Sequence, residues 1–135
     1  MTAFVWDESL DVSVAEMNEQ HRVLIGLMNT LYSKNEQGAD KSALLDSVED
    51  LLRYVVQHFN EEEAYMAQIA FPNLEAHKTL HGRLLEDLRR FADAFKNSEE
   101  HKLSKEFALF LNLWLATHIR GIDTKYGRYA QTLKA

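Results

Sequence analysis

The sequence predicts an all-α fold: an antiparallel up-down-up-down four-helix bundle with an N-terminal arm. Four successive segments place apolar residues at alternating steps of three and four, the spacing of helices that pack side by side. The links between these segments are short, which favours antiparallel neighbours. One proline and five glycines among 135 residues are too few for the many turns of an all-β protein.

We expect one domain over residues 1–135, beginning with an ordered arm that carries Phe4 and Trp6. The expected ranges are 1–12 for the arm, roughly 13–37, 41–70, 73–97 and 102–120 for the helices, and 121–135 for a C-terminal segment. Gly38 is a plausible stop for the first helix, and Asp40 a plausible N-cap for the second. Pro72 separates the second and third helices because proline cannot continue the preceding one.

Composition excludes several classes of protein. The formal net charge of -6 argues against a nucleic acid or an anionic membrane as partner, because both attract basic patches. The absence of cysteine excludes disulfides and thiolate-bound metal. The N-terminus lacks the apolar region of a secretory signal, and the longest apolar stretch, 107–116, is far short of the ~20 residues of a membrane span. We therefore expect a cytoplasmic protein.

Metal-binding side chains gather on the predicted buried seam. They are His21, His58, Glu62, His77, His81, His118 and Asp123. Residues four apart on a helix point the same way, so the pairs at 58 and 62 and at 77 and 81 can each bind a common centre. Polar groups in a core are costly unless they are satisfied, so this gathering predicts metal, and its size suggests more than one ion.

Each of these residues also has a simpler interpretation. His21 alone would more often be a hydrogen-bonded core residue. Ligation is favoured because all four helices contribute such groups, and because every one in the first three helices lies on the seam. Asp123 lies five residues after His118, ~140° around an ideal helix, so the fourth helix must end, loosen or bulge between them, and Gly121 is a reasonable place.

Several other polar or polarisable residues are assigned no role in the site. These are Glu61, Glu63 and His101, assigned to the solvated surface, Met17, Met28 and Met66, assigned to core filling, and Tyr126 and Tyr129, assigned to packing of the C-terminal segment.

With these motifs in this order, the sequence resembles the hemerythrins, and more closely the single-domain bacterial hemerythrins. The matching stretches are Asn18–His21, His58–Glu62, His77–His81 and Trp114–Ile119, running on to Asp123 and Tyr126. The resemblance covers essentially the whole chain. Asn18 departs from the family, which usually has aspartate there, and its presence removes no ligand.

The resemblance implies two non-haem iron ions bridged by carboxylates and by an oxide or hydroxide. It assigns His77, His81 and His118 to one iron, His21 and His58 to the other, and the bridges to Glu62 and Asp123. This donor set leaves one coordination position open, on the iron with fewer histidines. The positions that match the family's dioxygen pocket are all apolar here: Leu24, Phe59, Trp114, Leu115 and Ile119.

The expected function is reversible dioxygen binding for transport, storage or delivery, with no enzymatic activity. The chain lacks the Glu-x2-His pairs of bundle oxygenases among its seam residues, and its apolar pocket offers no acid or base to cleave dioxygen. The alternative is a module that senses oxygen, nitric oxide or redox state through a partner protein. Peroxidase-like or nitric-oxide-consuming enzymes and iron storage rank lower. An oxygen-consuming recipient protein is a possible partner, and a monomer is favoured.

Overall fold

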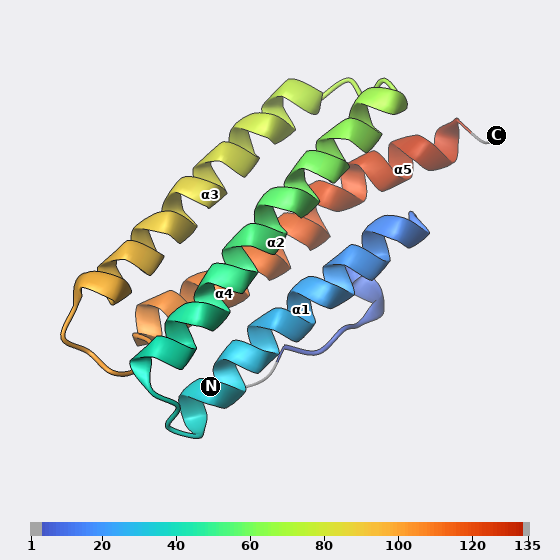
Figure 1. Ribbon diagram of the computed structural model, residues 1–135. Coiled ribbons are helices and arrows are strands. Elements are labelled where there is room, and N and C mark those ends of the chain that lie inside the picture. Colours follow the sequence, from blue (N-terminus) through green and yellow to red (C-terminus); the bar gives the residue numbers. More distant parts are fainter. Residues whose placement is uncertain (1–3, 134–135) are drawn as a thin grey trace.

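The computed structural model describes residues 4–133, which contain helices and no β-strand. Figure 1 shows an antiparallel four-helix bundle, as the sequence predicts. The elements are a 3-10 helix η1 (Glu8–Leu10), α1 (Ala15–Glu36), α2 (Lys41–Gln68), α3 (Leu74–Asn97), α4 (Lys105–His118), a π-helix η2 (Ile119–Asp123) and α5 (Thr124–Thr132). No described helix is both long and apolar enough to cross a membrane.

The helix ends follow from local chemistry. Gly38 lies just beyond α1 with a φ of 75°, a conformation that glycine adopts without steric cost. The Asp40 side chain accepts a hydrogen bond from the Ala43 backbone N–H at 2.9 Å and caps α2, as expected. Ser104 caps α4 in the same way through the Phe107 N–H, at 3.0 Å. The fourth helix therefore begins at Lys105, three residues later than its predicted start at 102.

The fourth rod of the bundle extends beyond the predicted range. Helices α4, η2 and α5 follow one another without a break, so the rod continues to Thr132 (Figure 1). Much of the C-terminal segment expected at 121–135 is thus helical, and residues 134 and 135 lie outside the described range. The five-residue π-helix is the bulge that the spacing of His118 and Asp123 required.

The N-terminal arm packs along the bundle. Phe4 exchanges two hydrogen bonds of 2.8 Å with the Asn29 side chain of α1. Arg120, within the π-helix, forms an ion pair with Asp7 at 2.8 Å. Gly127 of α5 lies against the Val12 backbone so closely that a β-carbon would fall 1.8 Å from the carbonyl oxygen. Residues 1–3 of the predicted arm lie outside the described range.

Candidate metal centre

The structure brings all seven predicted ligands together in the core. Among the described residues, nine polar or charged side chains are buried, and seven of them are these ligands. All four rods contribute. The donors are His21 from α1, His58 and Glu62 from α2, His77 and His81 from α3, and His118 and Asp123 from α4 and η2. The seam that the helical spacing predicts is therefore a single buried cluster.

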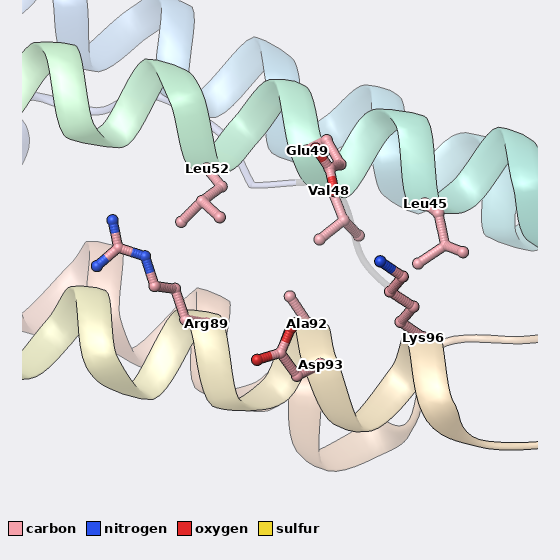
Figure 2. Close-up of a pocket in the computed structure, with 8 residues that line it drawn as sticks. All are labelled: Leu45, Val48, Glu49, Leu52, Arg89, Ala92, Asp93 and Lys96. Carbon is pink, nitrogen blue, oxygen red and sulfur yellow. The ribbon is translucent and has the colours of Figure 1, made fainter.

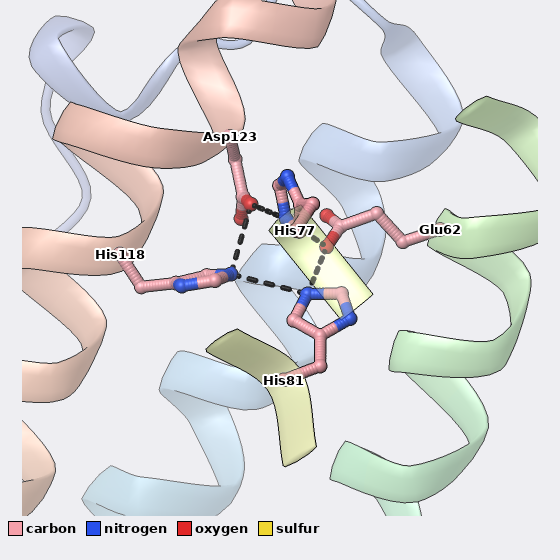
Figure 3. Close-up of side chains that lie close together, drawn as sticks. All are labelled: Glu62, His77, His81, His118 and Asp123. Carbon is pink, nitrogen blue, oxygen red and sulfur yellow. Dashed lines mark hydrogen bonds and ion pairs between the residues drawn. The ribbon is translucent and has the colours of Figure 1, made fainter. Parts of the chain in front are cut away.

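The donors form two overlapping groups, each with donor atoms within 4.8 Å of one another. Figure 3 shows the larger group, in which three imidazoles from α3 and α4 converge on the two carboxylates. The members of the larger group are Glu62, His77, His81, His118 and Asp123, and those of the smaller group are His21, His58, Glu62 and Asp123. The two carboxylates belong to both groups, and each histidine belongs to one.

Glu62 presents one oxygen to each group of histidines. Its Oε1 atom lies 3.0 Å from His81 Nε2 and 3.5 Å from His77 Nε2. Its Oε2 atom lies 3.3 Å from His58 Nε2 and 3.4 Å from His21 Nε2. A carboxylate divided in this way is placed to bridge two cations.

Asp123 repeats this division. Its Oδ1 atom lies 3.0 Å from both His77 Nε2 and His118 Nε2, and its Oδ2 atom lies 3.2 Å from His21 Nε2. The π-helix permits this geometry because its wider turn brings residues five apart onto the same face. The bulge contains Gly121, the place expected for it, but Gly121 has no positive φ; Gly38 is the only described glycine that has one. The wider turn, and not the conformational freedom of glycine, carries Asp123 back toward His118.

The donor set fits metal ions. Several of these buried atoms lack any hydrogen-bond partner, a costly state for a protein core. They are both His21 ring nitrogens, His77 Nε2, Glu62 Oε1 and both Asp123 carboxylate oxygens. Two donors held about 2.1 Å from one ion at right angles would be about 3.0 Å apart, close to the nitrogen–oxygen distances of 3.0 to 3.5 Å observed here.

The electrostatics of the cluster also call for positive charge. Burial alone would lower the pKa of His21, but the adjacent carboxylates of Asp123 and Glu62 outweigh burial and raise it to about 9. The same balance raises the pKa of His77 to about 9. Burial and the charge of Glu62 act to raise the pKa of Asp123, but His118 and His21 outweigh them and hold it well below its usual range. Protons thus neutralise the carboxylates, a role that metal cations would take over.

Two side chains that orient the histidines were missed from the sequence. Glu63 was assigned to the solvated surface, which is wrong: its Oε2 atom accepts from His81 Nδ1 at 2.8 Å, and the side chain is 22% exposed. Gln20 accepts from His58 Nδ1 through its amide oxygen at 2.6 Å. Each bond places the proton on Nδ1 and leaves the Nε2 lone pair directed at the cluster. Glu61 is exposed, as expected.

Tyr126 does more than pack the C-terminal helix. Its hydroxyl donates to Glu62 Oε2 at 2.7 Å, and the residue is fully buried. Burial, followed by the charges of Glu62 and Asp123, raises the pKa of Tyr126 well above its usual value, so the phenol stays protonated and remains a donor. This bond could not be predicted from local sequence patterns, because 64 residues separate the partners.

Asn18, the departure from the family pattern, serves the arm and not the cluster. Its amide oxygen accepts from the Val12 backbone N–H at 2.9 Å, and its amide nitrogen donates to Asp11 at 2.8 Å. An aspartate could not make the second bond. The asparagine at this position therefore matches the acidic arm of this chain.

The predicted dioxygen-pocket residues are all buried in the core. These are Leu24, Phe59, Trp114, Leu115 and Ile119, with exposed fractions of 1 to 6%. The Phe59 ring stacks on His81 with centroids 3.7 Å apart, and it lies 6.1 Å from the Trp114 ring in a T-shaped contact. Trp114 Nε1 is buried and unpaired. Among the five, Phe59 lies directly against the ligand histidines, and Trp114 packs behind it.

A separate surface groove lies between α2 and α3, toward the ends of these helices away from the ligands (Figure 2). It encloses about 180 Å³ and is lined by Leu45, Val48, Glu49, Leu52, Arg89, Ala92, Asp93 and Lys96. None of the seven donors lines it. The groove is therefore distinct from the metal centre.

Comparisons with known proteins agree with the geometry. A family model described as Hemerythrin HHE cation binding domain matches residues 12–130. Bacteriohemerythrin from Stenotrophomonas maltophilia (strain R551-3) is 28% identical over 126 residues, covering 93% of this chain and 80% of the relative. A hemerythrin-like protein from Naegleria gruberi is 32% identical over 123 residues, covering 91% and 90%. A crystal structure of wild-type hemerythrin superposes with a TM-score of 0.84 at 25% identity, covering 94% of this chain and 97% of the other.

Proposed function

Because this chain belongs to the hemerythrin family, we propose that it binds dioxygen reversibly at a non-haem di-iron centre, for oxygen transport, storage or delivery. One iron would be held by His77, His81 and His118, and the other by His21 and His58. Glu62 and Asp123 would bridge them. When bound, the two ferrous ions would supply the electrons that dioxygen takes up and returns.

The observation that carries this proposal is the division of both carboxylates between the two histidine groups. Glu62 and Asp123 each direct one oxygen at each group. A single cation would not need two carboxylates split in this way. The three-histidine group offers five donor residues and the two-histidine group offers four. The group with fewer donors is the one expected to keep a position free for an exogenous ligand.

The residues of the predicted pocket favour reversible dioxygen binding over enzymatic conversion of dioxygen. The five predicted pocket residues are apolar or aromatic and buried, so they would exclude water that promotes loss of electrons from the irons. None of the five supplies a carboxylate, imidazole or amine for the coordination position that is expected to stay free for an exogenous ligand. The indole N–H of Trp114 is the one side-chain polar group among the five, and it is a donor that cannot act as a base. No acidic or basic pocket side chain is therefore available to exchange a proton with bound dioxygen.

The direct test uses metal-free protein loaded anaerobically with ferrous iron. We expect two irons per chain and a visible absorption band that appears with oxygen and disappears when oxygen is removed. One iron per chain, or irreversible oxidation on first contact with oxygen, would count against the proposal. A ligand-dependent change in the proteins captured by the loaded chain would favour sensing instead.

Variants make this test specific. His58→Ala removes a donor from the two-histidine group and should lower iron retention. His101→Ala removes an exposed histidine outside the cluster and should leave the iron content unchanged. Trp114→Ala should keep both irons but speed oxidation of the oxygenated protein, since water would gain access. An unchanged oxidation rate would remove Trp114 from the proposed pocket.

A further inference from the structure

We propose that Glu63 and Gln20 make the two metal positions unequal, with the Glu63 carboxylate strengthening the three-histidine position through His81. This inference rests on the proposed di-iron centre and adds a positioning residue that acts on one metal alone. It predicts that the three-histidine position fills first. It also predicts that the metal affinity of this position exceeds what one additional histidine donor alone would give.

The geometry places the two orienting groups on opposite sides of the centre. Glu63 follows the bridging Glu62 on α2, and its side chain crosses to α3, where it accepts from His81 Nδ1 at 2.8 Å. Gln20 precedes His21 on α1 and crosses to α2, where it accepts from His58 Nδ1 at 2.6 Å. Each group therefore serves a histidine of a different metal position.

The two acceptors differ in charge. Both fix the same tautomer and direct the Nε2 lone pair of their histidine at the metal. A carboxylate acceptor also withdraws the Nδ1 proton more strongly than a neutral amide, which places more electron density on the imidazole and makes it a stronger donor. Electron density at the ligand stabilises higher positive charge on the metal.

The remaining contacts preserve this asymmetry. Within residues 4–133, every other close contact between a histidine and a carboxylate runs through Nε2, toward the shared centre. His21, the second histidine of the two-histidine group, has a buried Nδ1 with no partner at all. The charged outer contact thus falls on the three-histidine side alone.

The test measures stepwise binding of cobalt(II) to the metal-free full chain by chelator competition without oxygen. Cobalt(II) favours similar ligands to ferrous iron and binds somewhat more tightly. The tighter step is assigned to the three-histidine position because it offers more donors, and His118→Ala, which affects that group alone, should weaken that step selectively.

Glu63→Gln keeps an acceptor for His81 but removes its charge. We expect the tighter step to weaken roughly 10- to 100-fold, the usual effect of losing such an outer contact, with the weaker step unchanged. Gln20→Glu places a carboxylate on His58 and should tighten the weaker step, which tests the inference independently of Glu63. In the iron-loaded protein, Glu63→Gln should also raise the midpoint potential, a change that misfolding would not mimic at full iron content.

Glu61→Gln is the matched control, since it removes an exposed carboxylate on the other side of Glu62 without touching a ligand. Wild-type affinity in Glu63→Gln, equal weakening of both steps, or the same loss in Glu61→Gln would each overturn the inference. Uptake of fewer than two ions by the wild-type chain would overturn the di-iron proposal as well. Two-ion uptake without reversible oxygen binding would refute the proposed function and leave the role of Glu63 intact.

Discussion

Replacing Gly127 with alanine tests how tightly the N-terminal arm is clamped to the fourth rod. The added β-carbon would lie 1.8 Å from the Val12 carbonyl oxygen and 2.8 Å from its carbonyl carbon. Ordinary contact distances begin near 3.5 Å, so the arm must retreat by roughly 1.5 Å. The obstacle is backbone, which cannot turn away as a flexible side chain could.

The cost can be worked from what the arm buries. Leu10 and Val12 are 0% and 1% exposed, and full burial of each such side chain contributes about 1.5–3 kcal/mol. A partial retreat forfeits part of this, in line with the ~1–3 kcal/mol cost of overpacking. Alanine in a helix recovers up to ~1 kcal/mol relative to glycine. The obstacle is backbone, so the cost falls in the upper part of this range, and the net expectation is a loss of about 1–2 kcal/mol in the free energy of unfolding.

The assay is urea unfolding of the metal-free protein, because bound metal would add its own stabilisation. Gly82→Ala is the matched control: Gly82 is exposed within α3 and its β-carbon would contact nothing within 4 Å. We expect that variant to gain up to ~1 kcal/mol. If Gly127→Ala is as stable as the wild type while Gly82→Ala behaves as expected, the close approach of arm and rod is refuted.

Three further predictions concern the centre. Tyr126→Phe removes the hydroxyl that donates to Glu62 and should weaken metal binding roughly 10- to 100-fold with helical content unchanged, as measured by chelator competition; unaltered affinity would show that the bond is dispensable. Gly121→Ala should leave metal content and stability nearly unchanged, since its β-carbon would meet nothing within 4 Å and its φ is not positive; loss of metal would restore the role first expected for this glycine. The pKa values of His21 and His77 rise from 6.5 to about 9 in the metal-free fold, so their stabilising effect is complete below pH 6.5 and is lost as the pH rises through 9. Urea unfolding should show this loss in metal-free protein and a much smaller one in metal-loaded protein, and equal pH profiles would contradict it.

The fold was predictable because its signals are local. Helical periodicity, the cap at Asp40 and the stop at Gly38 each depend on a few neighbouring residues. The gathering of six of the seven donors was also predictable, since a shared seam follows from the same periodicity, and only Asp123 departs from it. The range predicted for the fourth rod was wrong at both ends: it began three residues too early because the cap at Ser104 was missed, and it ended too early because the helix was expected to stop near Gly121.

The outer contacts of the centre could not be predicted, because they depend on how side chains cross between helices. The angular position of Glu63 on α2 suggested solvent, and only the placement of α3 brings His81 within its reach. The spacing of His118 and Asp123 required an irregular turn but could not specify a π-helix. The ion pair between Arg120 and Asp7 joins residues that are 113 positions apart in the sequence, and no local pattern connects such distant residues.

Because the donors come from all four rods, iron binding depends on the folding of the whole bundle. Both positions share Glu62 from the second rod and Asp123 from the last, so a chain in which either of these rods is missing or unpacked lacks a donor of each position. Unfolding of either of these rods would open both positions together, so iron lost through unfolding should leave in one cooperative event even though the two positions differ in affinity. Retention of iron against a chelator therefore reports whether synthesis and folding have reached completion.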